Sequence, residues 1–216
     1  MEDLHKKTCL FALIGAALYA LLFCLVDRPV ALWIHRNLAG TWLETAGTYV
    51  SYLANGSLVR LGPALCFILI VLLDPGLKKK GTRGLLLVCL SAAVAITIGD
   101  GLKYLLGRCR PVLLFEEGRY GLTLFANRWE LNSTPSGHTI RAFAILTSLS
   151  LLDRPWRPFF IALAVLIGLS RVLVTAHYPG DVLFGSYIGI FSALWTYRYF
   201  PSVRINRAEA EPENPA

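Results

Sequence analysis

The sequence predicts an all-α protein, a polytopic membrane bundle of six transmembrane helices with an interfacial helix after the first span. Of its 216 residues, 55% are hydrophobic and only 16% are charged. Soluble domains carry about 25% charged residues, and disordered chains are poorer in apolar residues. The apolar residues also gather into six blocks with few or no charges, as membrane spans do. This composition excludes a disordered chain and argues against an ordinary soluble domain.

The first block, Cys9–Val26, predicts a span that is retained rather than a cleaved signal peptide. It is long for the apolar part of a signal peptide, and Asp27-Arg28-Pro29 follows it in place of small residues. Residues 29–56 are rich in Trp and Tyr, and the amphipathic piece Val30–Leu38 is typical of a helix lying at the membrane interface. A plain loop with a few core aromatics is the alternative interpretation.

Five further apolar blocks are expected to be helical: Leu61–Leu73, Gly84–Gly99, Ala142–Leu152, Phe159–Leu169 and Val182–Tyr197. The third of the six blocks is expected to continue as helix through Asp100 and Lys103, and the fifth to run on to about Ala176. A long polar stretch, from Arg108 to His138, separates the third block from the fourth. The tail Arg204–Ala216 is rich in Pro, Glu and Asn and is predicted to be disordered, which leaves residues 1–203 as the single domain.

The distribution of basic residues predicts the orientation in the membrane. Lys78, Lys79, Lys80 and Arg83 crowd the loop between the second and third spans, which the positive-inside rule places in the cytoplasm. With six spans, both termini share that side, and the loops after the first, third and fifth spans face outward. We therefore expect a multi-pass protein of the inner (cytoplasmic) membrane whose active site faces the periplasm or exterior.

The net charge of +7 has three interpretations. The first is the excess of basic residues in the loops of a membrane protein, and the second is a site for an anionic substrate. The third is a nucleic-acid partner, but the basic residues form no stripe that would bind one. The five cysteines are odd in number and form no C-x-x-C, so neither a disulfide framework nor a zinc site is indicated. No metal and no cofactor are expected.

Three clusters of polar residues interrupt the apolar pattern. The first cluster is Lys103-x6-Arg110-Pro111, in which a spacing of seven residues, two helical turns, places both cations on one helix face. Pro111 predicts that the helix ends at Arg110. Two cations aimed at one anion are the functional interpretation, and cations snorkelling at the end of a span are the structural one.

The second cluster is Ser133-Thr134-Pro135-Ser136-Gly137-His138. Thr134 is predicted to cap the fourth span, with Pro135 as its first helical residue. The amides of Ser136, Gly137 and His138 would then be free to bind an anion at the helix N-terminus. His138 would stand beside that anion, placed to give or take a proton. An ordinary helix start with a chance histidine is the alternative.

The third cluster is Ser170-Arg171-x5-His177-x3-Asp181. Pro179-Gly180 is predicted to end the helix after His177, and Asp181 to cap the sixth span. Such a reversal folds the Asp181 carboxylate back onto the His177 ring, fixing its tautomer and leaving the other ring nitrogen as a nucleophile. The alternative is a capping aspartate with an unrelated interfacial histidine.

Because all three clusters follow the third and fifth spans, they lie on one side of the membrane and predict a phosphate site with a nucleophile and an acid. In order and spacing, K-x6-R-P, P-S-G-H and S-R-x5-H-x3-D resemble the signature of the type 2 phosphatidic acid phosphatase superfamily. All eleven signature residues are present, and Cys109 stands where many relatives have Pro. The signature covers about residues 100–185, and the six-span layout extends the resemblance over nearly the whole chain.

The resemblance implies a metal-independent phosphatase that works through a phosphohistidine. His177 would attack phosphorus, Asp181 would orient it, and His138 would protonate the leaving oxygen and then activate water. The phosphoryl oxygens would be held by Lys103, Arg110, Ser136, Gly137 and Arg171. Soluble vanadium haloperoxidases share this pocket but lack such spans, and a non-catalytic scaffold would not need both histidines.

The substrate is expected to be a phosphorylated membrane lipid: undecaprenyl diphosphate, phosphatidylglycerophosphate, phosphatidate or lipid A. A lipid-to-lipid phosphotransferase would use the same residues and is the alternative function. The loop from Val112 to Thr134 borders the predicted site and is the candidate selector of the headgroup. Which lipid is bound, and in what oligomeric state, the sequence leaves open.

Overall fold

Helices form every regular element in the part of the chain that the computed structural model describes, residues 2–54 and 56–200. A lone β-bridge joins Arg108 to Leu122. The predicted disordered tail, Arg204–Ala216, lies outside the described residues. The helices in chain order are α1 (Glu2–Leu21), a π-helical turn (Leu22–Val26), α2 (Asp27–Leu38), α3 (Trp42–Tyr52), α4 (Gly56–Leu73), α5 (Lys80–Leu106), α6 (Pro111–Glu117), a 3-10 turn (Trp129–Leu131), α7 (Gly137–Leu152), α8 (Arg157–Leu173) and α9 (Pro179–Tyr199).

The first predicted block, Cys9–Val26, runs through α1 and the π-helical turn, each of the other five lies inside one helix, and most helices extend beyond their block into polar residues. The helix predicted to continue past Gly99 does so, as α5, through Asp100 and Lys103. The fifth block does not reach Ala176 as helix, because α8 ends at Leu173. The amphipathic piece predicted at Val30–Leu38 is part of α2, and α3 follows as a second short helix.

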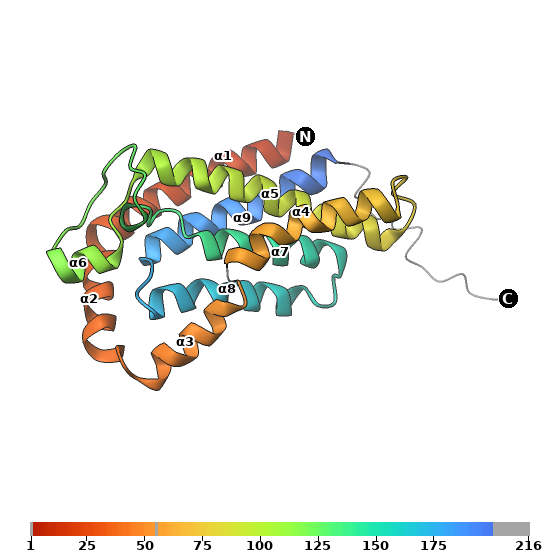
Figure 1. The fold of residues 1–216 in the computed structure, drawn as a ribbon. Coiled ribbons are helices and arrows are strands. Elements are labelled where there is room, and N and C mark those ends of the chain that lie inside the picture. The colour runs from red at the N-terminus through yellow and green to blue at the C-terminus, as the bar shows by residue number, and fades with distance from the viewer. Residues whose placement is uncertain (1, 55, 201–216) are drawn as a thin grey trace.

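Three helices, α5, α7 and α9, form the centre of the bundle (Figure 1). α7 packs against α5, α8 and α9, while α1 covers α9, α4 covers α5 and α3 covers α8. Small residues let α7 and α9 approach closely: a methyl group on Gly189 would lie 2.7 Å from the Ile140 carbonyl oxygen, and one on Gly185 would lie 3.0 Å from the Ser136 oxygen. Such small-residue contacts are common between helices that pack in membranes.

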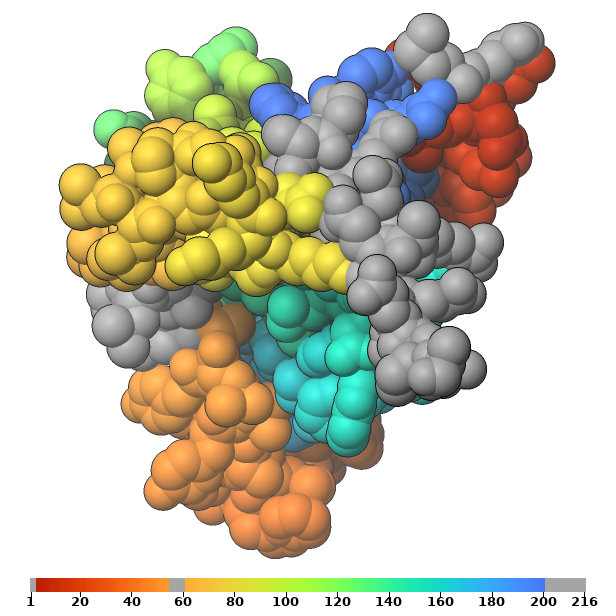
Figure 2. Space-filling view, turned by 90° about the vertical axis from the view of Figure 1, so that its right-hand side faces the viewer, coloured from red at the N-terminus to blue at the C-terminus, as the bar shows by residue number. Residues whose placement is uncertain are grey.

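The connections divide between the two ends of the bundle. Figure 1 shows α6 and the segments joining α5 to α7 and α8 to α9 at one end, and the α4–α5 loop with Lys78–Lys80 at the other. Figure 2 views the molecule onto the second end, where this loop lies near the end of α9. This two-ended arrangement is the one that the predicted orientation requires.

The outer surface of the helices is strongly apolar. Large side chains that a soluble core would bury stand exposed, among them Leu13 (71%), Leu72 (71%) and Leu25 (64%). In the described ranges, two helical segments are long and apolar enough to cross a membrane by composition, Asp3–Leu38 and Lys80–Leu106. Membrane association follows from this surface, while the count of six spans remains a prediction.

Candidate active site

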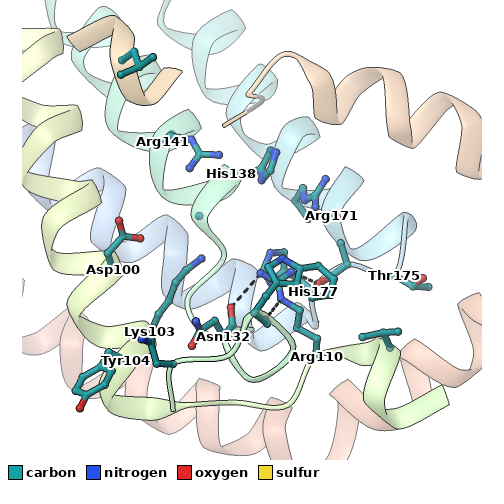
Figure 3. A pocket seen from close by; sticks show the side chains of 16 residues that line it. Asp100, Lys103, Tyr104, Arg110, Asn132, His138, Arg141, Arg171, Thr175 and His177 are labelled. Carbon is teal, nitrogen blue, oxygen red and sulfur yellow. Dashed lines mark hydrogen bonds between the residues drawn. The ribbon is translucent and has the colours of Figure 1, made fainter. Parts of the chain in front are cut away.

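A cavity of about 860 Å³ opens at the end of the bundle near α6 and brings the three sequence clusters together (Figure 3). Six of the eight predicted site residues line it: Lys103, Arg110, Gly137, His138, Arg171 and His177. Figure 3 shows Lys103, His138, Arg171, His177 and Arg110 arranged around this space, from α5, α7, α8 and the connections that follow α5 and α8. Segments more than 70 residues apart in sequence thus form a single site.

The helix that carries the start of the first cluster ends earlier than predicted. α5 ends at Leu106, not at Arg110, because Gly107 adopts a left-handed conformation (φ 50°) and its N–H caps the Lys103 carbonyl at 3.0 Å. Only glycine fits there, since a Cβ would lie 1.7 Å from the Thr123 oxygen. Lys103 and Arg110 therefore do not share a helix face, although both line the cavity.

Arg110 is held in place by main-chain oxygens of the surrounding loops. Its guanidinium donates from Nε to the Trp129 carbonyl at 2.9 Å, from Nη2 to Asn132 at 3.2 Å and from Nη1 to Ala176 at 3.3 Å. The Trp129 ring lies 4.4 Å from its Cζ. Burial lowers the pKa of Arg110 to about 10, so the group stays a cation at neutral pH. Its position is fixed before any anion binds.

The second cluster starts its helix two residues later than predicted. α7 begins at Gly137 with Ser136 as its N-cap, not with Thr134 and Pro135. The reason lies in α9: the Thr134 hydroxyl donates to the Asp181 carboxylate, and the Ser136 N–H donates to the Asp181 carbonyl at 3.1 Å. The Ser136 amide is thus occupied rather than free, and its hydroxyl accepts from Thr139 at 2.9 Å. Ser136 does not line the cavity, and its role in phosphate binding is unsupported by this geometry.

Gly137 lies between two cations. A Cβ at this position would be 3.2 Å from the Lys103 ammonium nitrogen and 3.4 Å from Nη1 of Arg141. Because Gly137 and His138 are the first residues of α7, their amides have no intrahelical acceptor. The missing side chain leaves a cradle between Lys103, Arg141 and the start of the helix, a combination that suits a phosphoryl group.

His177 lies between the cavity and a buried carboxylate. Its Nδ1 is 3.6 Å from Oδ2 of Asp181, which confirms that the two residues meet, at a distance longer than a hydrogen bond. Since Nδ1 faces Asp181, the other ring nitrogen faces away from the carboxylate. Burial, followed by the positive charge of Arg110, lowers the pKa of His177 to about 3 although Asp181 opposes the shift. The imidazole is therefore neutral at pH 7 and retains a nucleophilic lone pair.

Asp181 is the third residue of α9 and not its N-cap. The helix starts at Pro179 after Tyr178, whose N–H donates to Oδ2 of Asp181 at 2.9 Å. Ser133 donates to the same oxygen at 2.6 Å. The carboxylate thus caps the helix from inside, by a capping-box contact, while it faces His177.

Arg171 reaches the cavity from the last turn of α8. Its Nη1 donates to the hydroxyl of Ser51 on α3, so the short helix that follows the predicted interfacial piece helps to position this cation. Arg171 and His138 stand side by side in Figure 3, across the cavity from Lys103.

The region also contains residues that the motifs did not identify. Arg141 and Asn132 line the cavity, and Arg108 and Asp27 lie buried behind Asp181. A sequence signal existed for Asp27, because a carboxylate at the end of an apolar block is costly unless it is paired. Arg141 likewise follows His138 by three residues, which places it on the same helix face.

The sequence of residues 84–205 matches the PAP2 superfamily, over more than half of the chain. The chain belongs to this superfamily. Among curated relatives, a lipid A 1-phosphatase of Rhizobium etli is 38% identical over 95 residues, 44% of this chain and 41% of that protein. The bacitracin transport permease protein BcrC of Bacillus licheniformis is 36% identical over 72 residues, 33% of this chain and 36% of that protein. The match thus spans about two fifths of the length of the Rhizobium etli protein and a smaller share of the Bacillus licheniformis protein.

Two solved structures share the PAP2 fold of the chain. Aquifex aeolicus LpxE superposes with a TM-score of 0.54 at 26% identity, covering 81% of this chain and 96% of that one. A transmembrane PAP2 type phosphatidylglycerolphosphate phosphatase from Bacillus subtilis superposes with a TM-score of 0.60 at 16% identity, covering 93% and 99%. The second likeness concerns the fold alone. Together they place the described helices in a fold found in bacterial membrane phosphatases.

Proposed function

We propose that the protein is a membrane lipid phosphatase that works through a phosphohistidine at His177. One observation carries the proposal: a buried histidine backed by a carboxylate lies in a cavity with four cations and a second histidine. Phosphoryl transfer needs little covalent chemistry from a protein beyond positioning and charge stabilisation. Lys103, Arg110 and Arg171 supply positive charge where the phosphoryl oxygens would bind.

In the first step, the free nitrogen of His177 forms a bond to phosphorus while the bond from phosphorus to the lipid oxygen breaks. His138 donates a proton to the departing oxygen, which leaves as the lipid alcohol or lipid phosphate. Burial, followed by the nearby cations, lowers the pKa of His138 and disfavours its protonated form, and the negative charge of a bound phosphate offsets these cations. The same substrate that needs the acid thus favours its protonated form.

In the second step, water attacks the phosphohistidine and His138 accepts its proton. The bond from nitrogen to phosphorus breaks, which releases phosphate and restores neutral His177. Asp181 stabilises the positive charge that the His177 ring carries while it is phosphorylated. No metal ion enters either step, and metal independence is part of the proposal.

The first substrate to test is a lipid A 1-phosphate, since two lipid A 1-phosphatases are 38% and 37% identical to this chain over 95 residues. Undecaprenyl diphosphate, phosphatidylglycerophosphate and phosphatidate complete the panel. Phosphate release by the purified full-length protein from at least one of these lipids is expected, and release from none would refute the proposal. Phosphate appearing on an added lipid instead of in solution would assign the phosphotransferase reaction.

Two variants separate the roles of the histidines. With a radioactive aryl phosphate, whose leaving group needs little protonation, His138→Ala is expected to accumulate acid-labile label and then stall. His177→Ala is expected to form none and to lose turnover by several orders of magnitude. Label in His177→Ala without label in His138→Ala would reverse the assignment.

A further inference from the structure

Arg108 lies behind Asp181, on the side away from the cavity, and is completely buried. Its Nη1 donates to Oδ1 of Asp181 at 2.7 Å, and its Nη2 donates to Oδ2 of Asp27 at 2.8 Å. Four aromatic rings surround the guanidinium, with centroids 4.3 to 5.6 Å from Cζ: Tyr19, Phe23, Tyr120 and Tyr178. A charge buried so deeply is costly unless each of its partners is in place.

We propose that Arg108 and Asp27 are positioning residues for the nucleophile, acting through Asp181 on His177. The four groups form a continuous line, Asp27–Arg108–Asp181–His177, that starts in α2 and ends at the cavity. The inference rests on the proposed phosphohistidine chemistry and extends it to two residues outside the three sequence clusters.

The contacts of Asp181 show what Arg108 does. Oδ1 is occupied by Arg108 and Thr134, while Oδ2 faces Nδ1 of His177. With both oxygens held, the carboxylate cannot rotate, and the His177 ring keeps the orientation that points its other nitrogen away from Asp181. The ion pair also keeps Asp181 in its charged form, which a buried carboxyl otherwise disfavours.

The charge balance explains why Asp27 is needed. Asp27, Arg108 and Asp181 together carry a net charge of −1, and the attack of neutral His177 on phosphorus adds one positive charge to its ring. Without Asp27, the cationic ring would form next to a neutral pair rather than a negative group. In a site of low dielectric constant, this difference acts directly on the transition state.

The position of Asp27 is produced by an irregularity in the first helix. The π-helical turn Leu22–Val26 ends directly before it, and Asp27 is fully buried at the start of α2. π-helical turns recur at functional sites. Oδ1 of Asp27 also accepts the Gly180 N–H at 2.9 Å, three residues beyond His177. Asp27 therefore holds both Arg108 and the segment that follows the nucleophile.

Tyr120 completes the surroundings of Arg108. Its hydroxyl accepts from Nη2 of Arg108 at 2.8 Å and donates to the Phe23 carbonyl at 2.5 Å. Tyr120 belongs to the polar stretch between α6 and α7, so the loop predicted to select the headgroup also touches the positioning line. This contact offers a milder perturbation than the loss of a charge.

The test uses the purified full-length protein with an aryl phosphate, and it measures kcat, KM, the rate of phosphohistidine formation and the melting temperature. Asp27→Asn and Arg108→Lys are expected to lower kcat and the phosphorylation rate by about 10- to 100-fold, as for residues that orient a reactive group through a contact. KM should change less than about threefold, because neither side chain lines the cavity. Asp74→Asn is the matched control: Asp74 is a buried aspartate at the other end of the bundle, and kcat should be unchanged.

A purely structural role would lower the melting temperature without changing kcat per folded molecule, and that result would overturn the inference. A rise in KM at constant kcat would overturn it too, by making Arg108 a substrate contact. If the charge variants do not fold, Tyr120→Phe is expected to lower kcat about threefold at constant KM, and an unchanged kcat would be decisive against the inference. An inactive wild-type protein would instead refute the proposed phosphatase.

Discussion

Gly137 is the position at which one added methyl group tests where the phosphate binds. The Cβ of Gly137→Ala would lie 3.2 Å from the Lys103 ammonium nitrogen and 3.4 Å from Nη1 of Arg141. Both neighbours are the ends of flexible side chains, so each can shift by a few tenths of an ångström. Alanine also restricts the unfolded chain, which contributes about 0.4–1 kcal/mol of stability. These effects oppose each other, and the variant is expected to fold with a melting temperature close to that of the wild type.

The effect on activity should be much larger. A phosphoryl oxygen bound by Lys103 lies about 2.8 Å from its nitrogen, in the space that the new methyl group would occupy. Displacing a reacting group by about 1 Å costs about 100-fold in rate. That factor corresponds to about 2.7 kcal/mol, at about 1.36 kcal/mol per tenfold change. Gly137→Ala should therefore lower kcat/KM about 100-fold and weaken inhibition by inorganic phosphate.

Gly101→Ala provides the control for this experiment. Gly101 is on α5, two residues before Lys103, and a Cβ there meets nothing within 4 Å. This variant should gain stability, by up to about 1 kcal/mol, and keep wild-type kcat/KM. If folded Gly137→Ala also keeps the wild-type kcat/KM and inhibition constant, the anion does not bind against Gly137, and the cradle is wrongly placed.

Three further predictions follow from the charges and the two ends of the bundle. Activity should persist in EDTA, because Lys and Arg side chains supply the positive charge; a complete loss that magnesium restores would contradict this. In a background without the exposed Cys9 and Cys24, an impermeant thiol reagent should label Glu117→Cys but not Lys79→Cys in intact cells, and the reverse pattern would invert the predicted orientation. Hydrogen bonds from the Thr82 hydroxyl and from backbone amides that follow Asp74 in the chain lower the pKa of the Asp74 carboxyl to about 2. The stabilising effect of this carboxylate is therefore complete above about pH 4 and is lost as the pH falls through 2. Asp74→Asn should lower the melting temperature at pH 7, and the difference from wild type should shrink towards pH 2.

The sequence predicted the helices well where the composition of the segment itself requires a helix. Blocks such as Gly84–Gly99 can only be buried or face lipid, so their helical state follows from composition. The clusters were equally visible, because polar residues such as His177 stand out in an apolar chain. Helix ends were predicted less well: two-turn spacing placed Arg110 on α5, whereas Gly107 ends this helix with a left-handed residue.

The features that the sequence did not predict depend on contacts between segments that are distant in the chain. Thr134 has the properties of an N-cap, yet its hydroxyl donates to Asp181, 47 residues away. Asp27 and Arg108 are 81 residues apart, and nothing local pairs them. The cavity is also lined by residues outside the three motifs, Arg141 and Asn132 among them.

The close contact of α7 and α9 at Gly185 and Gly189 has a consequence for how the chain tolerates mutation. His138 is on α7 and Asp181 is on α9, so the gap between the acid and the positioned nucleophile is fixed by how near these two backbones lie. A methyl group at Gly189 would meet the Ile140 oxygen and the Phe143 Cβ, both at 2.7 Å, and would force the helices apart. The distance between the acid and the nucleophile therefore depends on two glycines that do not contact the substrate. A chain that kept every motif residue but replaced these two glycines would retain the signature and lose the geometry.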